Sequence, residues 1–301
     1  MTPGEKRRLL DGALTWIDRH LDYFDPFRDG QLTGLREIPL AELAILTLSA
    51  TRSSERVEQL FVSKWLDLLQ STCANPAYQQ RPFREPETLV SHAVVAAALE
   101  LAGRESPFHR ESVERLVRVS TITAPALPPH RLMELRHALD LARVPHALPS
   151  YRALFLNSLP AHRVNPICLS TPETYILTHV IFYAADLGHR RPVGFNARDG
   201  DRLARLVEQL LGMNIVAGNW DLTGELILSA GCLRSGSPFV EEGWECIAGA
   251  QRSDGAVPGP RARPTDETTP AWSEPEPASD VATCYHTTLV SCLAALAPIS
   301  A

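Results

Sequence analysis

The side chains best suited to acid–base chemistry lie around His179. Tyr175, His179, Phe182 and Asp186 follow the spacing i, i+4, i+7 and i+11, so on a helix they share one face. An imidazole beside a phenol, with the Glu173 carboxylate near the same end, can act as a general base or acid. A core histidine with satisfied hydrogen bonds gives the same pattern, so both interpretations stay open.

A second candidate segment contains Asp280, Cys284, Tyr285 and His286. Cys284 and His286 suggest zinc, but residues two apart on a helix point about 200° apart and cannot hold one ion. The sequence also has no HExxH pattern and no closely paired cysteines. We therefore expect no metal. Asp280 and His286 are expected beside His179, since two histidines with several carboxylates suit proton transfer.

Polar side chains recur near the start of other apolar segments. They are Glu42, Glu87, His92, Glu134, His137, Trp220, Asp221 and Glu225. Burying such groups is costly unless they are paired, so the set favours a shared polar cavity over a dry core. For any single residue, capping a helix or tying two helices together is the alternative. We predict catalytic roles for His179, His286, Glu173, Asp280 and Tyr175, and substrate-binding roles for Trp220, Asp221, Glu225, Glu42, His92, Tyr285 and Trp272.

The elements that must position these residues read as helices. Runs of alternating β-branched residues bounded by tight-turn dipeptides are nearly absent, whereas helical periodicity recurs. Ser170-Thr171-Pro172-Glu173 has the hydroxyl cap and acidic first turn of a helix start. About twelve helices are predicted, over 4–22, 39–51, 54–72, 86–103, 108–121, 129–143, 150–158, 170–187, 198–212, 218–234, 238–251 and 281–297.

The predicted helices alternate in character along the chain. Those over 54–72, 108–121 and 198–212 are amphipathic, whereas most intervening ones, such as 92–101 and 175–187, are apolar nearly all round and need cover on both sides. This alternation predicts an all-α (α/α)6 toroid, with six inner helices covered by six outer ones. An α-solenoid is the competing fold, but its repeats would show a sequence period, and none is evident.

A proline-rich acidic stretch interrupts the helical pattern over 252–280. Its prolines exclude a regular helix, and a loop this long inside a compact domain is often functional. We expect it to cover the cavity, with Trp272 as a plug; a solvated loop is the alternative. The whole chain, 1–301, is predicted to be a single toroid domain.

Composition narrows the function classes. The 301 residues carry a net charge of −6, which argues against a nucleic-acid groove. No apolar run is long enough for a membrane span, and the amino terminus lacks the apolar core of a signal peptide, so we expect a cytoplasmic protein. The six cysteines are scattered and read as buried small hydrophobes. Nucleotide-binding motifs are absent, and we expect no cofactor.

The stretch GWECIAGAQRSDG at 243–255 resembles the helix-end repeat of terpenoid cyclases and protein prenyltransferase β-subunits. In those families a helix ends in a glutamine, Asp-Gly and a loop follow, and then comes the next inner helix. Gln251, Asp254 and Gly255 match, and YHTTLVSCLAAL at 285–296 resembles that inner helix. The cyclase DxDD motif and the prenyltransferase Asp-x-Cys zinc motif are absent. The resemblance therefore implies the toroid and leaves the substrate open.

Two further segments carry a looser resemblance. LDYFDPF at 21–27 and TPETYILTH at 171–179 resemble small helical proteins of actinobacterial biosynthetic clusters. Some proteins of that kind assist small-ring closure, as in aziridine formation. The resemblance implies natural-product biosynthesis.

Our first hypothesis is a cofactor-independent cyclase that acts on a small molecule, free or carrier-protein-bound. His179 or His286 would remove a proton, and holding the nucleophile near the leaving group would accelerate ring closure. A non-catalytic ligand-binding or scaffold subunit of a heteromeric complex is the alternative. A carbohydrate-active enzyme is a third reading, and it would need two acids roughly 5–10 Å apart.

Overall fold

The computed structural model describes residues 1–53, 57–119, 127–260 and 280–298. These residues form thirteen α-helices and several short 3-10 turns, and none of them lies in a β-strand, so the predicted all-α class is confirmed. Six helices are inner: α2 (Glu37–Arg52), α5 (Leu89–Leu101), α7 (Pro129–Leu141), α9 (Thr171–Ala185), α11 (Trp220–Leu233) and α13 (Asp280–Leu296). Seven lie outside them: α1 (Pro3–Arg19), α3 (Gln59–Ala74), α4 (Pro76–Arg84), α6 (Pro107–Val119), α8 (Tyr151–Leu156), α10 (Ala197–Ala217) and α12 (Phe239–Ala250).

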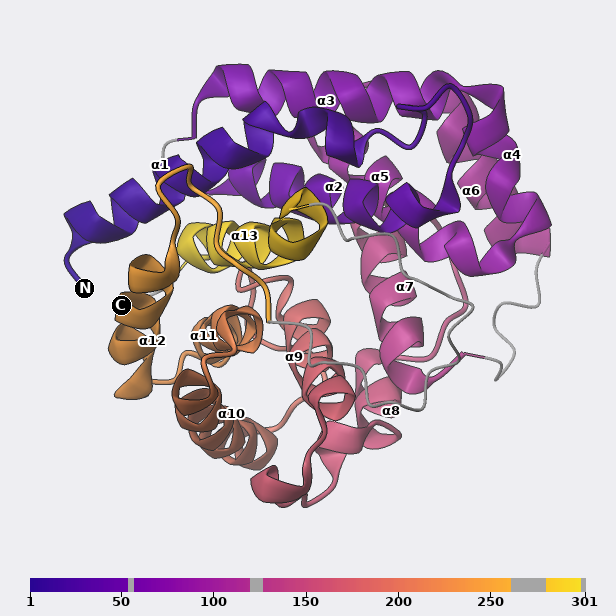
Figure 1. The fold of residues 1–301 in the computed structure, drawn as a ribbon. Coiled ribbons are helices and arrows are strands. Elements are labelled where there is room, and N and C mark those ends of the chain that lie inside the picture. Colours follow the sequence, from indigo (N-terminus) through magenta and orange to yellow (C-terminus); the bar gives the residue numbers. More distant parts are fainter. Residues whose placement is uncertain (54–56, 120–126, 261–279, 299–301) are drawn as a thin grey trace, which may run out of the picture.

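The six inner helices contact one another in cyclic order. Each of α2, α5, α7, α9 and α11 packs against the next inner helix, and α13 returns to α2 (Figure 1). Outer helices cover this ring, with α1 against α12 and α13, and α10 against α11 and α12. Such an order is what an (α/α)6 toroid would have, and membership of that fold stays our interpretation of the contacts.

Local sequence explains where individual helices begin. The Ser170 side chain accepts a hydrogen bond from the Glu173 backbone, and the Glu173 carboxylate accepts one from the Ser170 backbone, so α9 starts in a capping box. Asn196 and Asp199 form the same arrangement at the start of α10. The sequence missed α4, because Pro82 and its polar neighbours hide the helical pattern.

A buried ion-pair network ties three inner helices together. Asp186, in the left-handed conformation just past the end of α9, accepts hydrogen bonds from Arg52 of α2 and from His137 of α7. The Arg52 Nη1–Asp186 Oδ1 distance is 3.1 Å and the His137 Nε2–Asp186 Oδ1 distance is 2.9 Å. Although burial opposes ionisation, the hydrogen bonds from His137 and Arg52 hold the pKa of Asp186 well below its usual value. Asp186 therefore links the inner helices and is not paired with His179, although the sequence places both on one helix face.

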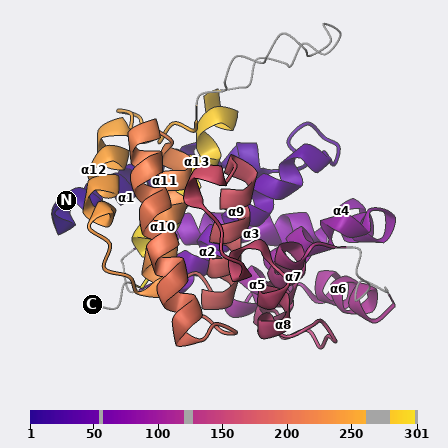
Figure 2. The same ribbon diagram turned by 90° about the horizontal axis from the view of Figure 1, so that it is seen from below.

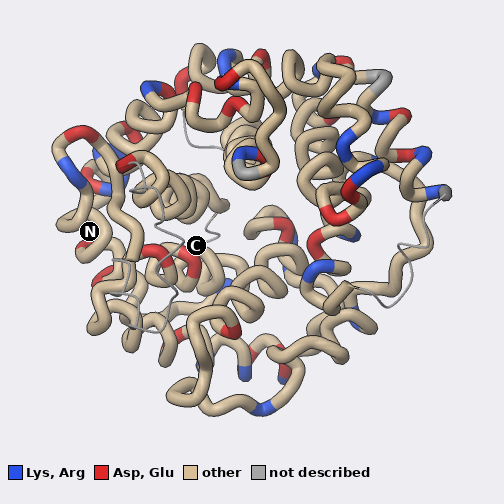
Figure 3. Tube along the Cα trace, turned by 45° about the vertical axis from the view of Figure 1, so that its right-hand side comes forward, with Lys and Arg blue, Asp and Glu red and all other residues tan. Residues whose placement is uncertain are grey.

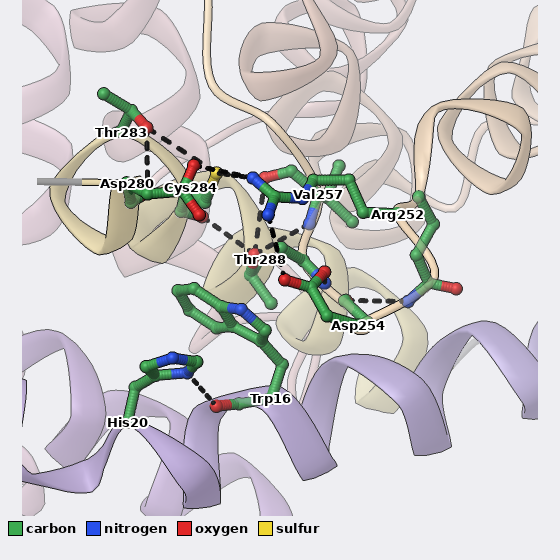
Figure 4. Close-up of polar contacts among 12 residues, drawn as sticks. Trp16, His20, Arg252, Asp254, Val257, Asp280, Thr283, Cys284 and Thr288 are labelled. Atoms are coloured by element: carbon green, nitrogen blue, oxygen red, sulfur yellow. Dashed lines mark hydrogen bonds and ion pairs between the residues drawn. The ribbon is translucent and has the colours of Figure 1, made fainter.

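The turn after α12 forms hydrogen bonds to both α1 and α13, the first and last helices of the described chain. Gln251 donates hydrogen bonds to the carbonyls of Leu9 and Gly255, and Gly255, with φ of +100°, lies directly against the Gly12 backbone. Figure 4 shows the same turn beside α13, where Thr288 accepts a 2.9 Å hydrogen bond from the Val257 backbone. The residues that resemble the cyclase repeat thus have a structural role here. Most of the proline-rich stretch, including Trp272, lies outside the described residues.

Candidate functional site

The imidazole of His286 on α13 lies among three carboxylates. Its Nδ1 is 3.1 Å from Glu42 Oε1 of α2, and its Nε2 is 3.7 Å from Asp221 Oδ1 and 3.6 Å from Glu225 Oε1 of α11. Asp221 and Glu225 are one helical turn apart, so α11 presents both to the same side. The inner helices thus bring together four residues from three apolar segments of the sequence. Asp and Glu positions border the middle of the ring (Figure 3).

Hydroxyl groups hold the two α11 carboxylates in place. Asp221 accepts hydrogen bonds from the Tyr175 hydroxyl of α9 and, at 2.8 Å, from the Thr287 hydroxyl of α13. Glu225 accepts one from the Thr178 hydroxyl of α9. Because both acids are almost fully buried, these donors replace the water that the carboxylates lose on folding.

The electrostatics of the cluster favour a charged His286. Desolvation disfavours the imidazolium, but Glu42, Glu225 and Asp221 outweigh it and raise the pKa of His286 well above its usual value. Burial raises the pKa of Asp221, whereas the pKa of Glu225 is lowered because His179 and His286 outweigh its desolvation. Burial and the Asp221 carboxylate also raise the pKa of Tyr175, so this phenol stays a hydrogen-bond donor.

His179 of α9 is held in one orientation at the edge of the cluster. Its Nδ1 is 2.7 Å from the Tyr175 carbonyl, which can only accept, so Nδ1 carries a proton. The same nitrogen lies 3.8 Å from Glu225 Oε2. In the neutral ring Nε2 is then the basic nitrogen, and it has no hydrogen-bond partner among the described residues.

Three residues of the cluster, Glu42, Glu225 and His286, line a cavity of about 280 Å³ between the inner helices. Its polar wall contains Glu42, His179, Glu225 and His286. The remaining wall is largely apolar, formed by residues including Ile38, Ile45, Val94, Phe182, Leu228, Leu289, Val290 and Leu293. One oxygen of Glu42, Oε2, is buried without a hydrogen-bond partner among the described residues, which leaves it available to a ligand.

A second hollow of about 390 Å³ adjoins the cavity between α7 and α9. The two share His179, Tyr183, Arg131 and Glu134, so this hollow is the mouth of the cavity. Arg131 is ion-paired with Glu134, and burial together with the Glu134 carboxylate raises the pKa of Tyr183 well above its usual value. Arg131 is not among the residues predicted from the sequence, because an arginine in the polar first turn of a helix is typical of a solvated position.

Two residues predicted to be catalytic lie elsewhere. Asp280 is 65% exposed and its Oδ1 is 2.6 Å from Arg252 Nη1, on the side of α13 that faces α1 (Figure 4). The expectation that it lies beside His179 is therefore wrong. Glu173 is exposed and forms the α9 capping box, so it does not reach the cavity. Asp280 pairs with Arg252 of a loop, and Glu173 pairs with the helix cap Ser170. Helical periodicity in the sequence does not predict either contact.

The predicted substrate-binding residues divide in the same way. Asp221, Glu225 and Glu42 belong to the cluster, but His92 does not: it is fully buried and stacked on Tyr78 of α4, with ring centroids 3.9 Å apart. The Nε2 of His109 of α6 donates a 3.0 Å hydrogen bond to the His92 carbonyl and completes a separate aromatic cluster.

The two aromatic predictions on the inner helices lie outside the cavity lining. Tyr285 packs on Tyr23, with ring centroids 5.1 Å apart, and burial with the nearby Glu42 carboxylate raises its pKa. Trp220 is partly buried against the core at the start of α11. Trp272 lies outside the described residues, so its predicted role as a plug has no structural counterpart here.

Two features are absent from the described residues: a helix that could span a membrane and a group of side chains that could bind a metal ion. No helix among them combines the length and apolar character needed to cross a bilayer. Nor do three or more of their His, Cys, Asp and Glu side chains come together as ligands for a metal ion.

Comparisons with known proteins give one match. No curated protein and no solved structure matches the chain. The family model described as a domain of unknown function, DUF6895, matches residues 10–296, a span that contains every helix of the inner ring and all of the cavity residues. The chain therefore belongs to the DUF6895 family.

Proposed function

We propose that the cavity catalyses an intramolecular ring closure by acid–base chemistry, without a cofactor. The observation that carries the proposal is the arrangement of two histidines around Glu225. Three carboxylates raise the pKa of His286. In His179, Nδ1 bonds to the backbone, and Nε2 has no hydrogen-bond partner among the described residues. Pairs of titratable groups with contrasting environments are typical of acid–base sites.

The overall reaction that we propose removes HX, a proton and a leaving group X, from the substrate. His179 Nε2 takes a proton from the substrate ammonium and so frees the nitrogen lone pair. The lone pair attacks a carbon of the same molecule, and the bond from that carbon to the leaving group X breaks with its electron pair. His286 then donates a proton to X. A small nitrogen heterocycle such as an aziridine is the product class that we favour, within bacterial natural-product biosynthesis.

The charge and size of the cavity support an amine substrate. Three carboxylates line the cavity, those of Glu42, Glu134 and Glu225, and they outnumber the two cations Arg131 and His286, so the polar wall is net negative. The unpartnered Glu42 Oε2 can accept a hydrogen bond from an ammonium group, and the apolar wall can cover a hydrocarbon body. Fixing both ends of a short chain brings nucleophile and leaving group together, which is a large source of rate in ring closure.

A ligand-binding subunit without catalysis is the second candidate. The observation that favours it is the internal pairing of the acids, since Asp221 accepts from both Tyr175 and Thr287. Groups already satisfied in this way can hold a ligand in place without moving a proton. A binding protein of this kind would keep its ligand affinity when His179 is replaced by glutamine.

The test uses primary amines with a leaving group on the carbon next to the one that bears the amine. Several different leaving groups are compared. Loss of HX is followed by NMR and mass spectrometry for the parent protein and for His179→Gln and His286→Gln. We expect each variant to lose about 10²- to 10⁴-fold in rate, the usual contribution of a general acid or base. His162→Gln is the matched control, since this exposed histidine lies outside the cavity lining. Folded variants with undiminished turnover would rule out the proposed roles.

A further inference from the structure

The outer helix α10 carries a stripe of arginines on its solvent side. Arg198, Arg202 and Arg205 follow the spacing i, i+4 and i+7, which places them within roughly 60° of one another around the helix. Arg163, from the segment preceding α9, joins them, and together they line a hollow of about 690 Å³. Figure 2 shows α10 running along the outside of the molecule.

This arrangement is built by specific contacts. Arg202 donates hydrogen bonds to the carbonyls of His162, at 2.9 Å, and Pro160, at 2.6 Å, which hold the segment bearing Arg163 against α10. The one acidic residue in the lining is Asp199, and its carboxylate is bonded to Arg152 at 2.5 Å.

Three of these arginines have no direct ion pair among the described residues. Arg163, Arg198 and Arg205 have no carboxylate within ion-pair distance in the part of the chain that the structure describes. The stripe is also opposite in sign to the chain as a whole, which carries a net charge of −6.

Exposed apolar side chains continue the same surface. Met213 and Val216 lie on the same face of α10 as the arginines, and Val216 is 90% exposed. Ile167, 80% exposed, lies on the 3-10 turn Pro166–Cys168, which packs beside α10. Arginines next to exposed large apolar side chains are typical of protein–protein interfaces.

The length of the surface indicates the kind of occupant. From Arg198 to Val216 the helix rises about 27 Å, which far exceeds one phosphate group and suits one side of a protein interface. A symmetric dimer of this chain would place arginine against arginine across its two-fold axis. An acidic partner of a different sequence avoids that repulsion.

We propose that this α10 face, formed by Arg163, Ile167, Arg198, Arg202, Arg205 and Val216, docks an acidic partner protein. None of these residues lines the cavity or its mouth, so the inference does not depend on the ring-closure reaction. Electrostatic attraction would speed the encounter and make it sensitive to salt, while the apolar residues would hold the complex.

The test measures binding of a fluorescein-labelled acidic peptide, built from the repeat EELEEAL, by fluorescence anisotropy at low and physiological salt. The double variant Arg198→Gln/Arg205→Gln should raise the Kd about tenfold, and Val216→Ser about threefold, because buried interface anchors dominate affinity. The matched control is Arg8→Gln/Arg191→Gln, which removes the same charge from exposed arginines elsewhere, and it should leave the Kd within about twofold.

Three results would overturn the proposal. An equal loss in the control variant would mean unspecific charge attraction. Displacement of the peptide by micromolar inorganic pyrophosphate, with the α10 variants also losing pyrophosphate binding, would mean a small-anion site. Light scattering that shows a concentration-dependent dimer, abolished by the α10 variants, would mean that a second copy of the chain occupies the face. Circular dichroism spectra of the variants verify that they remain folded.

Discussion

Removing the charge of Glu42 should lower the pKa of His286 by a measurable amount. The Glu42 Oε1–His286 Nδ1 distance is 3.1 Å, and two unit charges at that distance attract by about 5 kcal/mol at an effective dielectric constant of about 20. The His286 side chain is 34% exposed, so solvent screens part of this attraction. We expect about 2 kcal/mol to remain, which corresponds to a fall of about 1.5 pKa units in Glu42→Gln.

The pKa is measured by NMR titration of isotopically labelled histidine rings, with the His286 signal assigned from His286→Gln. Glu111→Gln is the matched control, since it removes the same charge from an exposed position on α6. We expect this control to leave the pKa of His286 nearly unchanged. A parent His286 that titrates near its usual value of about 6.5, or an equal shift in both variants, would refute the electrostatic reasoning.

The same pKa predicts how stability depends on pH. Because the pKa of His286 is raised in the folded protein, its stabilising contribution is complete below the unfolded value of about 6.5 and is lost as pH rises through the folded pKa. Urea unfolding of the parent protein should therefore show a loss of stability on the alkaline side that is smaller in Glu42→Gln. An alkaline loss of the same size in both proteins would contradict this assignment.

Three further predictions concern the fold. Burial lowers the pKa of His92 to about 2, so the stability that the neutral ring contributes is lost as pH falls below the unfolded value of about 6.5. His92→Phe should therefore recover about 2 kcal/mol of unfolding free energy at pH 5 relative to pH 7.5. Gly255→Ala should cost more than about 3 kcal/mol, because its Cβ would lie 2.1 Å from the Gly12 oxygen, whereas Gly249→Ala, with open space in α12, should stabilise by about 0.5–1 kcal/mol in thermal unfolding. Asp186→Asn leaves Arg52 without its buried partner and should cost about 3 kcal/mol in denaturant unfolding; a cost below about 1 kcal/mol would contradict this.

The helices and the polar faces of the inner ring were predictable because both follow from periodicity. Asp221 and Glu225 are one turn apart on an apolar helix, and His179 and His286 lie on two others, so a ring of inner helices is sufficient to bring them together. Periodicity gives the face of a residue but not its height along the ring or its partners in loops.

The wrong predictions for Asp280 and His92 arise because periodicity does not reveal loop partners or unrecognised helices. Asp280 occupies the first turn of α13, where Arg252 from the preceding turn reaches it, and a turn of that kind leaves no periodic signal. His92 stacks on Tyr78, which belongs to α4, the helix that Pro82 conceals in the sequence. A residue packed against an unrecognised element could not have been placed correctly.

Closure of the inner ring through α13 has a consequence for synthesis on the ribosome. The helices that carry Glu42, Asp221 and Glu225 all precede α13 in the chain, so these acids are translated before His286. Until α13 docks between α11 and α2, the nascent ring lacks both its closing wall and the cation that compensates those carboxylates. The chain thus assembles its most charged interior last, and a nascent protein stalled before α13 would expose an open, acidic seam for chaperones to shield.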